Sequence, residues 1–282
     1  MSSDFDLEER SRNKVEERAH RIKMEWDTPA FDGKILLLVE NKNDRRCYFK
    51  LFNPDHVEIQ TTEGCNNMRH LFAAIQMTGV PNFAIQDSDF SRVCGNEPPE
   101  DNYFITDYHD HEMMCLAEED VMKALFVNKA TAYDKVMVDE VFDDLTLLSQ
   151  YKWFNYYHHS NVNFSGYKVR GRSKSDLCSF SSINAEVMPQ SPNCHVSIKE
   201  ADVTTFVNGQ PQIDRFELTN GHDFVDLLAQ RIGEKTKEAN LRTEDLRIIM
   251  YANFVSAMFR RTNLYRDICN WAGGETVNLF AA

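Results

Sequence analysis

The sequence of 282 residues lacks the long apolar runs of membrane proteins and the paired cysteines of zinc ribbons and disulfide frameworks. No run approaches the roughly 18 apolar residues that a membrane-spanning helix needs. The seven cysteines are scattered and form no C-x-x-C pair, which favours reduced thiols. The first residues also lack the basic and apolar regions of a signal peptide. We therefore expect a cytoplasmic protein that makes no contact with a membrane.

Positive charge is also scarce. The 31 Lys and Arg residues stand against 44 Asp and Glu residues, which gives a net charge of −13. A field of that sign repels nucleic acid at long range. A nucleic-acid enzyme with this composition would need a divalent metal, a local basic patch or a partner protein. The hydrophobic content of 42% and charged content of 27% are those of an ordinary globular chain.

Short apolar runs alternate with helical patterns in the first part of the chain. Strands are expected at 34–40, 57–60, 83–85 and 103–106. Helices are expected to end near residues 52 and 77, and another follows residue 112. This alternation predicts right-handed βαβ units, and so an α/β fold with a mostly parallel sheet flanked by helices.

The rest of the chain lacks this alternation of strands and helices. The interleaved charges of residues 7–26 predict a solvated helix. The pattern from 121 to 150 is helical and acidic, and 175–215 is interpreted as loop-rich. Thr243 is expected to cap a later helix. The chain is therefore divided into an N-terminal helix over 1–30, an α/β domain over 31–118 and a mainly helical C-terminal domain over 119–282.

Acidic residues follow three of the expected strands. Glu40 ends the first strand, Asp87 and Asp89 follow the third, and a cluster over 107–112 follows the fourth. The carboxyl ends of parallel strands share one edge, where ligands bind in open α/β sheets. Carboxylates held close together repel one another unless a hard cation such as Mg²⁺ lies between them. The alternative for Asp87 and Asp89 is an ordinary turn after a strand.

Other polar residues near this edge have two interpretations each. Glu112 either binds a second metal ion or favours the start of its helix by its charge. His109 and His111 are interpreted as exposed loop histidines, because no matching Cys or His pair supports a zinc site. Lys42 either contacts a phosphate or is simply a solvated lysine.

An aromatic stretch over 151–159 precedes the densest basic stretch of the chain, which is a weak nucleic-acid signal. Aromatic rings can stack on bases while cations hold phosphates. The alternative is a packed helix followed by a solvated loop. The basic residues of this candidate are Lys168, Arg170, Arg172 and Lys174.

Four segments together resemble the TOPRIM-like family of bacterial proteins that includes the nuclease effectors of PARIS-type anti-phage defence. They are V-E-N-K-N-D, G-C-N-N-M, I-Q-D-S-D-F and T-D-Y-H-D-H-E, at 39–44, 64–68, 85–90 and 106–112. The later N-G-H-D segment at 220–223 also resembles a motif of the family. The family usually has glycine after the glutamate of the first motif, and Asn41 takes its place here.

The resemblance implies a metal-dependent endonuclease. In TOPRIM proteins the D-x-D carboxylates, here Asp87 and Asp89, hold Mg²⁺, for which Mn²⁺ can substitute. The glutamate, here Glu40, binds a second metal ion or acts in acid–base chemistry. The resemblance further implies a homodimer, an ABC-type ATPase partner that holds the effector until infection, and host tRNA as a substrate favoured over DNA.

Three alternatives stay open at this point. The chain could be a TOPRIM nuclease that acts on DNA, or a non-catalytic, regulated subunit of a defence complex. A nucleotide-sugar transferase also uses D-x-D to bind a metal. That enzyme normally has a nucleotide-binding loop after its first strand, and Glu40-Asn41-Lys42 gives no such signal.

Overall fold

The computed structural model describes residues 2–238, 240–273 and 276–281, with side chains from residue 13 onward except at 65, 66, 276 and 277. Contacts divide the chain into two compact units. Unit 1 comprises Met1–Asp87, Pro98–Thr106 and Val255–Ala282, and unit 2 comprises Ser88–Glu97 and Asp107–Phe254. The last part of the chain therefore belongs with the sheet, whereas sequence analysis grouped it with the helical domain. Among the described helices, none combines the length and apolar character needed to cross a membrane.

Unit 1 is built on a four-stranded, all-parallel sheet, and the expected α/β class is confirmed. The strands are β1 (Ile35–Val39), β2 (Val57–Thr61), β3 (Asn82–Gln86) and β4 (Tyr103–Ile105). Their order is β2-β1-β3-β4, and Leu37 of β1 lies opposite Ile59 of β2 and Phe83 of β3. The helices of this unit are α1 (Ser2–Trp26), α2 (Lys42–Tyr48), α3 (Cys65–Gln76), α13 (Ser256–Phe259), α14 (Asn263–Ala272) and α15 (Thr276–Leu279), with a 3-10 turn at Pro29–Phe31.

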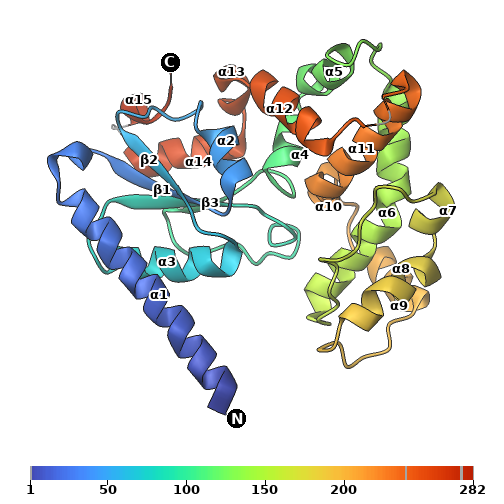
Figure 1. Cartoon of the computed structure of the whole chain (residues 1–282), viewed down its shortest axis with the longest axis horizontal. Helices are drawn as coiled ribbons and strands as arrows, with labels where there is room; N and C mark the ends of the chain where they lie inside the picture. Colours follow the sequence, from blue (N-terminus) through green and yellow to red (C-terminus); the bar gives the residue numbers. More distant parts are fainter. Residues whose placement is uncertain (1, 239, 274–275, 282) are drawn as a thin grey trace. The chain divides into compact units, whose positions relative to one another are not determined.

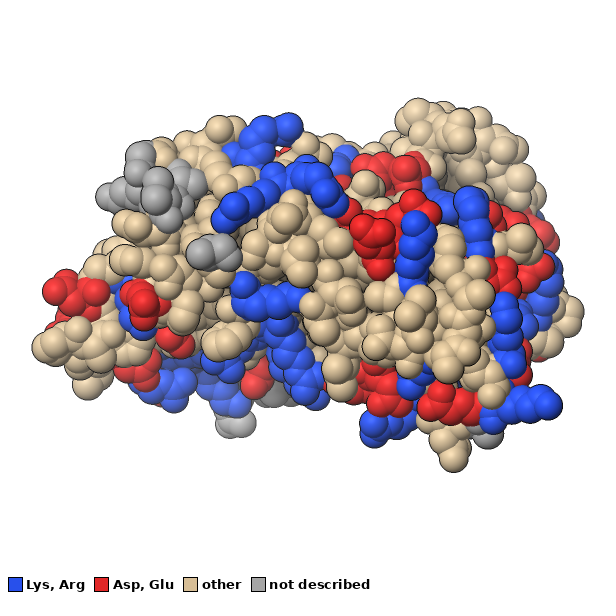
Figure 2. Space-filling view, turned by 90° about the horizontal axis from the view of Figure 1, so that it is seen from above, with Lys and Arg blue, Asp and Glu red and all other residues tan. Residues whose placement is uncertain are grey.

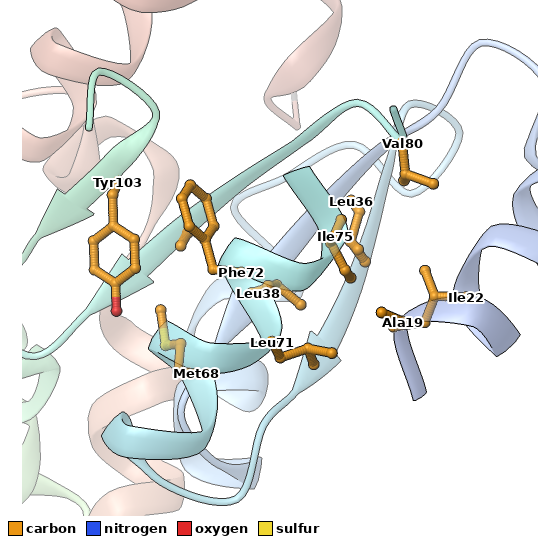
Figure 3. Packing of buried hydrophobic residues seen from close by; sticks show 11 residues of the cluster. Ala19, Ile22, Leu36, Leu38, Met68, Leu71, Phe72, Ile75, Val80 and Tyr103 are labelled. Carbon is orange, nitrogen blue, oxygen red and sulfur yellow. The ribbon is translucent and has the colours of Figure 1, made fainter. Parts of the chain in front are cut away.

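One face of the sheet is covered by α1 and α3, and the other by α2 and α14 (Figure 1). Alternate strand residues point to opposite faces. Leu36 and Leu38 therefore face α1 and α3, where they join a buried cluster with Ile22, Leu71 and Ile75 (Figure 3). Burial on both faces explains why β1 is a continuous aliphatic run.

The second face of the sheet is packed with aromatic rings. Phe83 of β3 lies 5.7 Å from the ring of Phe52 and 5.4 Å from that of Trp271 in α14, measured between centroids. Phe259 of α13 lies 6.0 Å from Phe52 and is 1% exposed. These contacts explain why residues 255–282 belong to unit 1 although the segment Asp107–Phe254 of unit 2 separates them from β4 in the sequence.

Unit 2 is helical. The long helix α6 runs beside α11 and α9 in this unit. The helices are α4 (His111–Leu116), α5 (Glu119–Val127), α6 (Lys135–His158), α7 (Lys174–Leu177), α8 (Phe180–Val187), α9 (Glu200–Asn208), α10 (Arg215–Leu218), α11 (Gly221–Thr236) and α12 (Thr243–Asn253), with a 3-10 turn at Met188–Gln190.

The helical pattern expected over 121–150 is confirmed and is divided between α5 and α6. Ala130 has a left-handed backbone (φ 52°) between the two helices, and Asp134 caps α6 by accepting the Met137 N–H. A second expectation about these helices was wrong. Residues 175–215 are not mainly loop. They hold four short helices, of which α7 and α8 are capped by Ser173 and Ser179. Their shortness leaves little hydrophobic periodicity for a sequence pattern to detect.

The structure also shows which residues cap α12 and α14. Thr243 is the first residue of α12 and not its cap, which is Arg242, and the Thr243 hydroxyl donates a hydrogen bond to Asp226 instead. Thr262 caps α14 by accepting the N–H of Tyr265. The aromatic stretch that begins at 151 continues α6 to His158.

We predict that Phe259→Ala lowers the free energy of unfolding by about 3–5 kcal/mol, because it removes a fully buried ring from the second face of the sheet. Urea denaturation followed by circular dichroism measures this change. Met77→Ala is the control, since Met77 is 88% exposed and its loss should change stability by less than about 0.5 kcal/mol. Equal effects of the two substitutions would show that residues 255–282 do not contribute to this core.

Candidate functional site

The carboxyl edge of the sheet has its topological switch point between β1 and β3. The chain passes from β1 to β2 on one side and then crosses to β3 on the other. Glu40 directly follows β1, and Asp87 directly follows β3. Val39 and Ile85 are partners in the register, so both strands end at the same level. Parallel pairing thus brings these two predicted residues to the place where open α/β sheets bind ligands.

Asp44 is a third acidic residue of this edge, and sequence analysis did not select it. Its Oδ2 accepts the Asn41 N–H at 2.9 Å, while Asn41 Oδ1 accepts the Asn43 N–H at 2.7 Å. This capping box fixes Asp44 in the first turn of α2, where it is 2% exposed. Carboxylate oxygens of Asp44 and Asp87 lie within 4.8 Å of each other. The signal that could have found Asp44 is its place four residues after Glu40, at the end of V-E-N-K-N-D.

The backbone conformation at position 41 does not require the glycine that the family usually has there. The Asn41 backbone is extended, with φ −147° and ψ −178°, a conformation open to any residue. The asparagine side chain also caps α2, which a glycine cannot do. Lys42, the first residue of α2, is exposed.

Glu40, Asp44 and Asp87 are here called the strand-edge carboxylates. The group of ligand atoms that lie close together includes Asp44 and Asp87 but not Glu40. The strand-edge carboxylates offer hard oxygen ligands, which Mg²⁺ prefers. The separation of the Asp44 and Asp87 oxygens is compatible with one ion between them. One oxygen of Glu40, Oε1, is buried. The residues present therefore fit the metal that sequence analysis expected.

Asp89 lies in unit 2, two residues after Asp87. The strand ends at Gln86, and Asp89 adopts a left-handed backbone (φ 46°) in the turn that follows, a conformation that Asp tolerates better than most residues. Its N–H donates to the carbonyl oxygen of His109 at 2.7 Å. Desolvation by the surrounding protein raises the pKa of Asp89 to about 6, and the charge of Lys152 opposes the rise. The Asp89 side chain keeps 46% of its surface exposed, so solvent screens its interactions with nearby charges.

His109 and His111 are buried, at 2% and 0% exposure, and the expectation of exposed histidines was wrong. The ring of His109 packs edge-on against Phe90 at 4.7 Å, and its Nδ1 lies 3.3 Å from the carbonyl oxygen of Glu217. Burial, and to a smaller extent the charge of Lys152, lower the pKa of His109 to about 3. His109 is therefore a neutral core histidine at physiological pH.

Glu112 is completely buried, and charged or polar groups from three helices surround it. Its Oε1 lies 3.3 Å from Arg247 Nε and 3.5 Å from His222 Nδ1, and accepts a hydrogen bond from the Tyr251 hydroxyl at 3.4 Å. Its Oε2 lies 3.3 Å from His111 Nε2. Desolvation raises the pKa of Glu112, but the charges of His111, His222 and Arg247 outweigh it, so its pKa lies below the usual value.

Asp110 holds the beginnings of α4 and α11 together. Its Oδ1 accepts the Met113 N–H at 2.9 Å as the cap of α4, and its Oδ2 accepts the Gly221 N–H at 2.6 Å. A Cβ atom on Gly221 would lie 2.3 Å from Asp110 Oδ1 and 2.5 Å from Glu112 Cβ, so only glycine fits there. Burial raises the pKa of Asp110 to about 8, and the negative charge of Glu112 contributes to the rise.

Asp110, Glu112 and His222 are here called the helix-start cluster. Each offers one ligand atom, and these three atoms lie within 4.8 Å of one another. Of the predicted site residues, only Glu112 belongs to it. Asp110 and His222 were visible in the sequence only as parts of H-D-H-E and N-G-H-D, whereas Arg247 and Tyr251 carried no sequence signal at all.

The predicted basic stretch of unit 2 is engaged in contacts with its own unit. Arg172 pairs with Glu186 and lies 4.2 Å from the ring centre of Tyr167. Lys174 lies 3.1 Å from Asp144, and an Arg170 guanidinium N–H donates to the carbonyl oxygen of Leu241 at 2.5 Å. Lys168 is exposed. Both acidic and basic side chains lie on the face that Figure 2 shows.

We predict that His109 makes the protein less stable in acid. Its pKa is lower when folded than when unfolded, so unfolding takes up a proton below about pH 6.5, and stability falls by about 1.4 kcal/mol per pH unit between there and pH 3. His109→Phe removes this contribution. Urea denaturation between about pH 6.5 and pH 4.5 should show a shallower loss in the variant, by about 2.7 kcal/mol.

The exposed His195 provides the control for this experiment. His195→Gln should leave the pH dependence of the wild-type protein unchanged, because water surrounds the His195 side chain in the folded and in the unfolded protein. If His109→Phe also leaves it unchanged, His109 does not remain neutral in the folded protein.

Comparison of the chain with models of protein families, with curated proteins and with solved structures finds no match. The residues themselves offer two kinds of ligand. Hard oxygen donors lie at the strand edge, and a mixed set of carboxylates and a histidine lies at the helix starts.

Proposed function

We propose that this protein is a Mg²⁺-dependent endonuclease of the TOPRIM-like family. The observation that carries the proposal is the convergence of Glu40 and Asp87 at the switch point of a parallel sheet, with Asp44 beside Asp87. The resemblance of the motifs around these residues to TOPRIM-like nucleases supports the same conclusion. The expected substrate is RNA, with tRNA favoured over DNA.

The strand-edge carboxylates would hold the ion, together with Asp89 as the second member of D-x-D. Bound Mg²⁺ supplies positive charge that a phosphodiester needs as it is cleaved. The capping box holds Asp44 in one orientation, so this ligand is organised before an ion binds. Glu40 would either bind a second metal ion or accept a proton from the attacking water, the two roles that the resemblance implies.

The biological setting that we propose follows from the resemblance. The protein would act in the bacterial cytoplasm as a homodimeric effector of anti-phage defence, released from an ABC-type ATPase partner during infection. The net charge of −13 suits docking on a basic partner surface. Because the basic stretch is largely paired within unit 2, the partner or the metal would help to bring the phosphates to the site.

We predict that the free protein cleaves tRNA with Mg²⁺ present and that EDTA abolishes cleavage. Glu40→Gln and Asp87→Asn should each lower the rate about 10³-fold, which corresponds to about 4 kcal/mol of lost transition-state stabilisation. Gel assays with tRNA and with duplex DNA, at matched concentrations, measure the rates and the substrate preference.

Asp55→Asn is the matched control. Asp55 is an exposed acidic residue of unit 1 just before β2, at the opposite edge of the sheet, so its loss should leave the rate unchanged. Cleavage that persists in Glu40→Gln and Asp87→Asn would contradict the proposal. Absence of cleavage by the wild-type protein on every nucleic acid, with the ATPase partner removed, would favour a non-catalytic subunit.

A further inference from the structure

A second set of metal donors lies within unit 2, separate in composition from the strand-edge carboxylates. The helix-start cluster places carboxylate oxygens of Asp110 and Glu112 and a ring nitrogen of His222 within 4.8 Å of one another. A six-coordinate ion with bonds of about 2.1 Å separates its ligands by about 3–4 Å. The distance of 3.5 Å between His222 Nδ1 and Glu112 Oε1 falls in this range.

One atom in this cluster points to a ligand independently of the spacing. Glu112 Oε2 is buried, and it accepts no hydrogen bond from any residue that the structure describes. The nearby His111 Nε2 lies closer to the Tyr251 oxygen, at 2.9 Å, than to Oε2, at 3.3 Å. Tyr251 in turn donates its proton to Oε1. A buried carboxylate oxygen is costly to leave without a hydrogen bond or a cation, and a metal ion would satisfy it.

The local backbone is built to bring these groups together. Gly221 lets the start of α11 approach Asp110 and Glu112 more closely than a side chain would allow. The next residue, His222, then lies against Glu112 while 45% of its side chain stays exposed. An ion could therefore enter from solvent through His222 and meet two buried carboxylates behind it.

Groups around the cluster orient its ligands as the outer shell of a metal site does. The Met113 and Gly221 N–H groups fix the Asp110 carboxylate, and Arg247 holds Oε1 of Glu112. Such contacts position ligands and are commonly as important as the ligands themselves.

We propose that Asp110, Glu112 and His222 bind a divalent first-row transition-metal ion. A nitrogen ligand beside two carboxylates suits Zn²⁺ or Mn²⁺ better than Mg²⁺, which prefers oxygen alone. This proposal stands independently of the nuclease function, because it uses none of the strand-edge carboxylates.

The test uses the full-length protein, stripped with chelator and dialysed. Isothermal titration with ZnCl₂, and separately with MnCl₂, should give a site that disappears in His222→Ala and in Asp110→Asn, so that each variant binds one ion fewer per chain. Glu40→Gln is the matched control, since it alters the other set of carboxylates and should keep this site. Thermal unfolding checks that each variant is folded, and added Zn²⁺ should raise the melting temperature of the wild-type protein more than that of His222→Ala.

His222→Cys gives a second measurement that does not depend on loss of binding. A thiolate at this position should bind Cd²⁺ and produce the ultraviolet charge-transfer band of a cadmium–thiolate bond. The control Asn220→Cys, two residues away, should produce no such band.

Two results would overturn the proposal. One is a folded wild-type protein that binds neither Zn²⁺ nor Mn²⁺, which would make the cluster a network of ion pairs only. The other is binding that His222→Ala and Asp110→Asn leave unchanged. Loss of nuclease activity in Glu40→Gln, with Zn²⁺ binding intact, would support both proposals, whereas intact Zn²⁺ binding in a protein without nuclease activity would support this one and contradict the nuclease.

Discussion

The parallel pairing of β1 with β3 is the interaction on which the candidate nuclease site depends. Both strands are buried on two faces, so a shift of their register by one residue would turn leucine and phenylalanine side chains to the wrong face. The hydrophobic core therefore fixes the level at which each strand ends. Since the strands are parallel, both ends lie at one edge, and Glu40 and Asp87 follow them there. Core packing, through the register, thus sets the relation between two polar residues that are far apart in the sequence.

Unit 2 buries several ionisable side chains among its helices. Glu112 and Asp110 are both inaccessible to solvent, and they lie within reach of Arg247, His111 and His222. Burial and the charge of Glu112 raise the pKa of Asp110, whereas the charges of His111, His222 and Arg247 outweigh burial and lower that of Glu112. Neighbouring groups whose pKa values are shifted in opposite directions are typical of functional sites, and structural networks of ion pairs produce them too. The observation that favours the proposed metal site over such a network is that Oε2 of Glu112 is buried and accepts no hydrogen bond from the described residues.

The net charge of −13 acquires a clearer meaning from the structure. The basic side chains that the sequence grouped over 168–174 are divided among Glu186, Asp144 and a backbone carbonyl, so they neutralise local charge in unit 2. Three of these four residues therefore do not form an open row of cations for a phosphate backbone. A nuclease with this surface depends on its metal ions, or on a partner, to offset repulsion between protein and nucleic acid.

The sequence alone determined the α/β class, the four strands and the acidic residues at their ends, because strand-length apolar runs and Gly, Asn and Asp turn residues are local signals. It also singled out Glu40 and Asp87. Tertiary structure decided what those signals could not show. Asp44 became part of the edge through a capping box, His109 and His111 proved to be buried, and residues 255–282 joined the sheet through Phe259 and Trp271. His222 and Arg247 reach Glu112 only because α4, α11 and α12 pack together, and contacts between residues over 100 positions apart leave no periodic trace in a single sequence.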